Sequence, residues 1–190
     1  MPSGGSPIKS ATMSPAARAA PSVSADHSIE SARRPFQYSV SGGIDLAICR
    51  LRVDDVGAAE RVLDEVTAAA SGASGFHDWL WAMRLAWARA EIAAARRDRD
   101  GVERWAAETL TMAAGCRPKY EVAALVTRAR VRTGHAALAD LDRAVALARP
   151  LGDPALLVRA ARPRLALDGS DALAAEVREA EATIRTARPT

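Results

Sequence analysis

Three short segments of similar sequence recur along this chain at a spacing of 39 residues. They begin at Cys49, Ala88 and Thr127, and a weaker copy begins at Ala161, 34 residues after the third. Each carries Arg in its second place and Val, Ile or Leu in its fifth. A period of roughly 20–50 residues marks arrays whose units bury their apolar faces against one another. We therefore expect a repeat architecture, which usually presents a binding surface and performs no chemistry.

The composition favours helices packed through small side chains. Apolar residues make up 49% of the 190 residues and aromatic residues only 4%, while Ala is the commonest type. Such a composition, with few β-branched runs, predicts an all-α fold.

The chain divides into a leader and a helical domain. Residues 1–42 are rich in Ser, Pro, Ala and Gly, and we expect them to be disordered because they bury too little apolar surface. Their Arg and Ser content superficially resembles an organelle transit peptide, although a flexible leader or a misassigned start codon explains it better. Residues 44–187 carry helical apolar periodicity throughout.

Breaks in this periodicity predict eight helices. Ser-Gly runs, Arg117-Pro118 and Gly152-Asp153-Pro154 punctuate the chain, and Pro163 should kink or shorten the helix around it. The expected helices cover residues 44–53, 55–70, 77–96, 99–114, 118–133, 136–149, 154–167 and 171–187.

Paired helices of this length, with small residues at tight positions and Gly-Asp-Pro between units, resemble tetratricopeptide repeats. The small residues are Ala59, Ala137 and Ala144. More narrowly, Trp79–Leu85 and Lys119–Val122 resemble the repeat region of large bacterial ATP-binding transcription regulators. The resemblance implies an αα-hairpin solenoid of about four helix pairs over residues 44–187. The chain departs from the repeat pattern where first helices carry Ala for large residues, and it has no phosphate-loop or helix-turn-helix motif.

The repeated segments also align arginines, which are our main candidates for a binding site. One column contains Arg50, Arg89, Arg128 and Arg162. If the offset is one repeat, these guanidiniums stack along the edge that resembles the concave groove, where planar donors suit carboxylates. A second column, mixed in sign, could pair with the first internally; it contains Arg52, Glu91, Arg130 and Arg164. The competing interpretation is that both columns are solvated faces with salt bridges between repeats.

Trp81 and Arg84 are the other candidates. Trp79 and Trp81 lie two residues apart, so a helix cannot point both into one core. We expect Trp79, Met83 and Trp87 to share the core face and Trp81 to be exposed near Arg84 as a peptide anchor.

Other functions find little support. The net charge of +3 does not indicate nucleic-acid binding, and no stretch is apolar enough for a membrane span or a secretory signal. His and Cys show no metal-ligand spacing, and no motif for catalysis or a cofactor occurs. Cys49 and Cys116 should be free, buried thiols in a reducing cytoplasm.

The two ends of the array differ. The last helix is polar on its outer face, carries Glu181 and Arg185 one turn apart, and should solvate the end of the stack. The first helix is apolar on two sides and needs a cover: a preceding repeat, a second copy of the chain by self-association, or residues 36–40 folding back.

The sequence therefore predicts a cytoplasmic, non-enzymatic module that binds an acidic or C-terminal protein segment in an Arg-lined groove. The alternative is the C-terminal repeat fragment of a bacterial ATP-binding transcription regulator, acting as a sensor or scaffold without its ATPase and DNA-binding domains.

Overall fold

A computed structural model of the chain describes residues 40–71 and 77–187. Those residues form eight α-helices joined by short turns, and none of them lies in a strand. The predicted all-α class is confirmed. The leader predicted over residues 1–42 lies mostly outside the described residues, but residues 40–42 already belong to the first helix.

Observed and predicted helix bounds agree within a few residues. The first helix covers residues 40–52, and it is followed by α2 (Val56–Ser71), α3 (Asp78–Ala95), α4 (Arg99–Ala113), α5 (Pro118–Ala129), α6 (Gly134–Ala148), a 3-10 turn η1 (Arg149–Leu151), α7 (Pro154–Leu167) and α8 (Asp171–Thr186). Two bounds differ by four residues: the first helix begins earlier than expected, and α5 ends earlier.

The turn before α7 shows how local chemistry sets these bounds. Gly152 adopts a left-handed conformation with φ 61°, which favours glycine because it lacks Cβ. Asp153 then caps α7 by accepting from the backbone N–H groups of Ala155 and Leu156, and Pro154 is the first helical residue. Pro163 does not shorten α7 as predicted, since the helix continues to Leu167.

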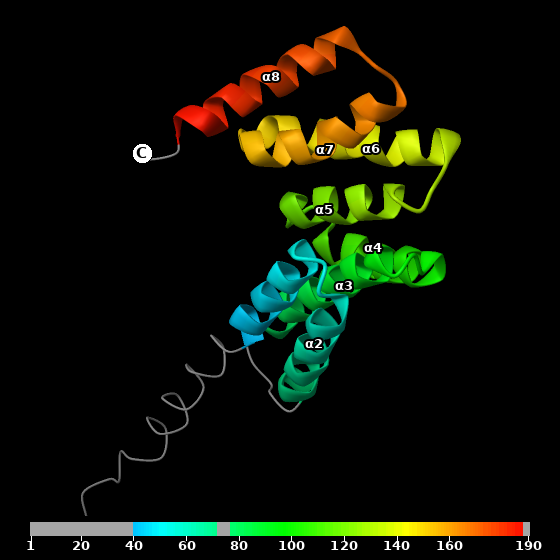
Figure 1. Cartoon of the computed structure of the whole chain (residues 1–190), viewed down its shortest axis with the longest axis vertical. Coiled ribbons are helices and arrows are strands. Elements are labelled where there is room, and N and C mark those ends of the chain that lie inside the picture. The colour runs from blue at the N-terminus through cyan, green and yellow to red at the C-terminus, as the bar shows by residue number, and fades with distance from the viewer. Residues whose placement is uncertain (1–39, 72–76, 188–190) are drawn as a thin grey trace, which may run out of the picture. The chain divides into compact units, whose positions relative to one another are not determined.

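The helices pack mainly against their neighbours in sequence. Each helix from α2 to α8 contacts the next one, and α3 also contacts α5, as α5 contacts α7 (Figure 1). The first helix, α3, α5 and α7 therefore form one set, called the first helices below, and α2, α4, α6 and α8 form the second helices.

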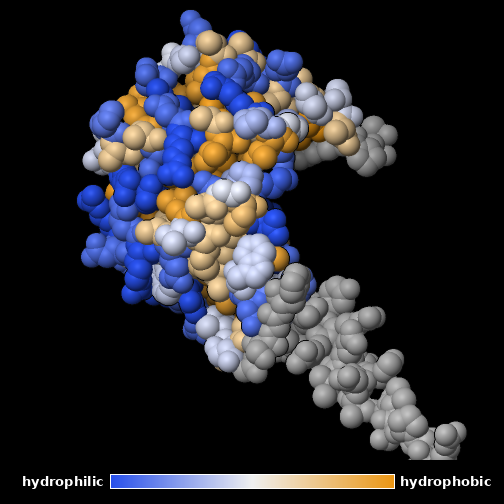
Figure 2. All heavy atoms as spheres, turned by 180° about the vertical axis from the view of Figure 1, so that it is seen from behind, coloured by the Kyte–Doolittle hydropathy of each residue, from blue (hydrophilic) through white to orange (hydrophobic). Residues whose placement is uncertain are grey.

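Two main apolar clusters hold these helices together. One joins the first helix to α2 and α3 through Ile44, Leu63 and Trp81. The other joins α5 to α8 through residues such as Leu125 and Leu141, which are at most 1% exposed. Many positions at the contacts are fully buried Ala, so the helices approach closely. Figure 2 shows polar and charged residues over much of one face, with apolar patches between them.

Trp81 is the clearest correction to the predicted core. Its side chain is only 5% exposed, whereas Trp79 is 43% exposed and lies under the guanidinium of Arg117. Trp81 shares a helical stripe with Leu85, Ala88 and Ile92, which faces the first helix and α2. The predicted exposed anchor is therefore a core residue. Met83 is buried as expected, while Trp87 is half-buried.

The two ends of the array agree in part with the predictions of an uncovered first helix and a polar last helix. Leu46 and Val53 of the first-helix region are 46% and 70% exposed, so this side lacks a cover among the described residues. Of residues 36–40, 36–39 lie outside the described range, and self-association stays a prediction. Helix α8 buries Leu173, Val177 and Ala180 and exposes its polar side. Glu181 accepts from Arg162 rather than from Arg185.

Both thiols are exposed, which corrects the expectation that they are buried. Cys49 lies on the outer side of the first helix, and Cys116 lies in the turn between α4 and α5. Within the described ranges, no helix is both long enough and apolar enough to cross a bilayer.

Two adjacent glycines give a test of how tightly the first helix packs. A Cβ on Gly43 would lie 2.2 Å from a methyl carbon of Val66, whereas one on Gly42 would meet nothing within 4 Å. We expect Gly43→Ala to lower the free energy of unfolding by about 1–2 kcal/mol because overpacking outweighs the gain in helix propensity. Gly42→Ala is the matched control and should leave stability unchanged or raise it. Equal effects in urea denaturation would contradict this packing.

Candidate functional site

The four arginines of the main predicted column do not line one open surface. Arg50 lies 3.9 Å from Asp55, and Arg89 donates to Thr67 and stacks on Trp105. Arg128 and Arg162 are paired as well, in both cases with a carboxylate on the following second helix.

Each member of this column is therefore directed toward a second helix or the residues just before one. Arg128 is the firmest case, since its Nε and Nη2 donate to the two oxygens of Asp140 at 2.9 and 2.6 Å. Asp140 is 6% exposed and also accepts from Arg132, which in turn pairs with Glu103 of α4. Three of the four arginines, Arg89, Arg128 and Arg162, therefore join a first helix to a second helix.

Arg84, the other predicted basic candidate, lies among the first helices. Its guanidinium donates to Asp45 of the first helix, and its side chain is 14% exposed. Tyr120 of α5 is close to both charges, and burial raises the pKa of its phenol. The Tyr120 ring meets the edge of Trp87 at a centroid distance of 5.8 Å. The surface around Trp87 thus extends to Tyr120, Arg84 and Asp45.

The second, mixed-sign column contains the more informative group. Glu91 of α3 accepts from Arg130 at the end of α5 at 2.8 Å, as the 39-residue offset places them side by side. This ion pair forms within the second column and joins neighbouring first helices, as the interpretation of salt bridges between repeats expects. No ion pair joins the two columns among the described residues. Arg164 lies elsewhere and pairs with Asp142 and Asp168.

Glu91 gathers donors from three first helices. Its Oε2 accepts from Arg130, while its Oε1 accepts from Arg159 of α7 at 2.8 Å, from Thr127 of α5 at 2.7 Å and from the Trp87 indole N–H at 3.2 Å. The Glu91 side chain is 12% exposed. Glu91 therefore links α3, α5 and α7 through one carboxylate.

A cavity of about 420 Å³ opens beside this carboxylate, and we call it the Glu91 cavity. All four first helices contribute to its wall, which consists of Ile48, Leu51, Arg52, Trp87, Glu91, Ala94, Ala95, Arg130 and Arg159. The wall combines an apolar part with three arginines and a single carboxylate, which leaves an excess of two positive charges. This size lies in the ordinary range of ligand-binding pockets.

The electrostatics of the cavity are set by its crowded arginines. Burial lowers the pKa of Arg159, Glu91 opposes that effect, and the nearby charges of Arg130 and Arg52 lower the pKa further. The Arg159 guanidinium also lies over the Trp87 ring, 5.5 Å from its centroid. Arg52 is exposed and forms no hydrogen bond or ion pair with any residue that the structure describes. The arginines of the Glu91 cavity can therefore bind an anion.

Comparison with known proteins identified no relative of this chain. No family model, curated protein or solved structure matches the chain. The resemblance to tetratricopeptide repeats consequently stays a prediction that rests on the residues themselves.

Sequence reasoning missed the central part of this site. Glu91 and Arg130 were aligned by the 39-residue offset, and opposite charges at equivalent places of neighbouring helices were a usable signal for an ion pair. Arg159 lies 68 residues from Glu91 and outside both columns, so the repeat alignment gave no signal for it.

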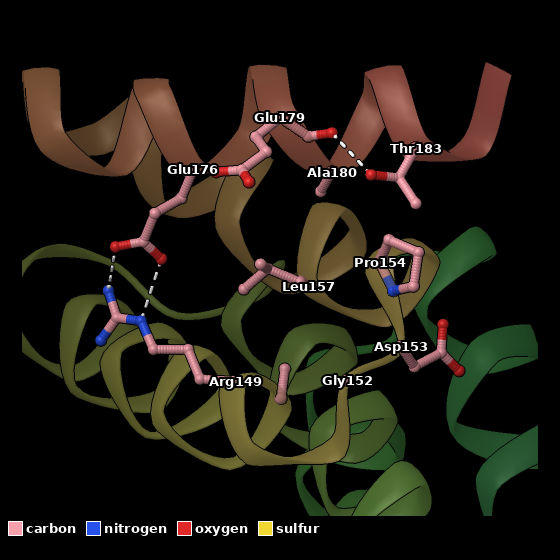
Figure 3. Close-up of a pocket in the computed structure, with 10 residues that line it drawn as sticks. Arg149, Gly152, Asp153, Pro154, Leu157, Glu176, Glu179, Ala180 and Thr183 are labelled. Carbon is pink, nitrogen blue, oxygen red and sulfur yellow. Dashed lines mark hydrogen bonds and ion pairs between the residues drawn. The ribbon is translucent and has the colours of Figure 1, made fainter. Parts of the chain in front are cut away.

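A second cavity, of about 280 Å³, lies between the turn before α7 and helix α8 (Figure 3). Its arginine and two of its carboxylates are already paired: Arg149 donates to both oxygens of Glu176, and Asp153 accepts from Lys119. That ion pair, with two backbone N–H groups, lowers the pKa of Asp153. The wall of this second cavity carries one arginine and three carboxylates, an excess of negative charge that does not suit an anion, so we take the Glu91 cavity as the candidate site.

Proposed function

We propose that this chain is a non-enzymatic, tetratricopeptide-like module of about four helix pairs that binds an acidic or C-terminal peptide segment. The contacts of α3 with α5 and of α5 with α7 support a repeat whose first helices share one face. The binding site we propose is the Glu91 cavity, which replaces the column of Arg50, Arg89, Arg128 and Arg162.

The observation that carries this proposal is the excess of positive charge around a partly apolar cavity. Three guanidiniums line it with one protein carboxylate, which only two of them contact, and guanidiniums bind carboxylates with paired, charge-assisted hydrogen bonds. The apolar residues of the first helix and α3, with Trp87 beside them, offer contact area for a neighbouring ligand side chain. The C-terminal residue of a peptide could use both features, since its carboxylate would bind the arginines and its side chain would contact the apolar residues.

A direct test uses the indole N–H signal of Trp87, which lies beside the cavity and is assigned by loss in Trp87→Phe. The probe is the acetylated peptide Gly-Ser-Ser-Gly-Ser-Leu with a free C-terminus, titrated at millimolar concentration in two-dimensional NMR. We expect the free acid to shift this signal and the C-terminal amide to bind at least about tenfold more weakly, because it lacks the charge. Equal shifts from both peptides, or none, would contradict the proposal.

Two arginines on one helix provide matched variants. We expect Arg52→Gln to weaken binding of the free acid by about 3- to 10-fold, since it removes an exposed cation of the cavity. Arg50→Gln changes the same residue type two positions away and should have no effect, because Arg50 lies outside the cavity wall. The reverse result would restore the predicted arginine column as the site.

A further inference from the structure

Glu91 places a carboxylate of the protein itself where the cavity would hold an anion. Arg130 and Arg159 both donate to it at 2.8 Å, so two of the three cations of the cavity are engaged by the protein itself. Only Arg52 has no acceptor among the described residues.

The two oxygens of Glu91 are unequally engaged. Oε2 accepts one donor, Arg130, whereas Oε1 accepts three: Thr127, Arg159 and the indole of Trp87. A carboxylate oxygen has two lone pairs, so three donors on Oε1 exceed what it can satisfy well. The Thr127 hydroxyl is also shared, since it lies 2.8 Å from the carbonyl oxygen of Ala123.

Arg159 is the donor on Oε1 that a ligand can engage most easily. Its side chain is 35% exposed, while Thr127 is fully buried in α5. It also faces the charges of Arg52 and Arg130, and an incoming anion would relieve this repulsion.

We infer that Glu91 is an internal competitor of the ligand: the ligand carboxylate binds between Arg52 and Arg159, displacing the Arg159–Glu91 contact while Glu91 keeps Arg130. This inference rests on the proposed function, and it adds that Glu91 sets the affinity of the cavity for a peptide carboxylate. Glu91 then has two effects, because it links three helices and also weakens binding of anions.

The test compares wild-type protein with Glu91→Gln, using the same free-acid peptide and its amide. Gln keeps an oxygen that can accept from Thr127 and Trp87 but removes the charge. We expect the free acid to bind about 3- to 10-fold more tightly to Glu91→Gln, although the variant melts at a lower temperature. The amide should bind equally to both proteins. Weaker binding of the free acid to a folded Glu91→Gln would overturn the inference, since Glu91 would then be a positioning residue for the arginines.

A second pair of variants keeps the inference testable if Glu91→Gln does not fold. Arg130→Gln/Glu91→Gln removes both partners of one ion pair and leaves no unpaired charge from it. The double variant should bind the free acid more tightly than Arg130→Gln alone, and weaker or equal binding would overturn the inference. Failure of the proposed function is distinct, because no protein of the series would then prefer the free acid to the amide.

Discussion

Replacing Trp81 by Ala should lower the free energy of unfolding by about 3–5 kcal/mol, the usual cost of removing a large aromatic side chain from a core. Trp81 is 5% exposed and lies in the cluster that joins the first helix, α2 and α3. The loss would leave a cavity at the point where three helices meet. Guanidinium denaturation followed by far-UV circular dichroism measures the change.

Trp79→Ala is the matched control, two residues away on the same helix. Trp79 is 43% exposed, and its main described contact is the guanidinium of Arg117, 5.0 Å from the ring centroid. An exposed cation–π contact contributes about 0.5–1 kcal/mol, so the control should lose no more than about that. A larger loss for Trp79→Ala than for Trp81→Ala would reverse our assignment of the core face of α3.

Asp140→Asn is expected to have the second largest effect on stability. The Asp140 side chain is 7% exposed and accepts two hydrogen bonds from Arg128 and one from Arg132. Breaking a fully buried ion pair costs about 3–5 kcal/mol, and partial exposure of both arginines reduces this to about 2–3 kcal/mol. Thermal and urea unfolding of the variant would measure the loss.

Asp142 of the same helix offers a control for the charge change alone. Its side chain is 59% exposed and pairs with Arg164 at the surface. We expect Asp142→Asn to lower stability by less than about 1 kcal/mol, as exposed ion pairs usually do. If the two variants were equally destabilised, the buried network of Arg128, Asp140 and Arg132 would not have the structural role assigned to it.

Helix positions were predictable because the chain marks its turns with residues of strong local preference. Gly152, Asp153 and Pro154 end one helix, cap the next and begin it, so the start of α7 was predicted at the observed residue. The end of α5 was less clear, because Arg130 to Thr133 contain no breaker before Gly134. The 39-residue offset also aligned Glu91 with Arg130, which form an ion pair, while the repeat itself stays a prediction.

Side-chain roles were harder to predict, because they depend on which faces of a helix meet neighbours. Helix α3 buries one stripe with Trp81 toward α2 and another with Met83 and Ala90 on a different side. Because α3 has two buried stripes and no single apolar face, the spacing alone could not predict whether Trp79 or Trp81 is buried. The partners of the arginine column were hard to predict for a related reason: equal spacing predicts equivalent positions but not whether the side chains face a groove or a second helix.

The ion pair between Glu91 and Arg159 links the cavity to local unfolding at the end of the array. Most helix contacts join neighbours in sequence, so the array can fray from its C-terminal end without unfolding elsewhere. Arg159 belongs to that end, yet its partner lies 68 residues earlier, on α3. Local unfolding of α7 and α8 would therefore remove Arg159 from the cavity wall while α3 and α5 stayed folded. The population of this frayed state, measurable by amide hydrogen exchange in α7, sets the fraction of molecules in which the cavity is complete.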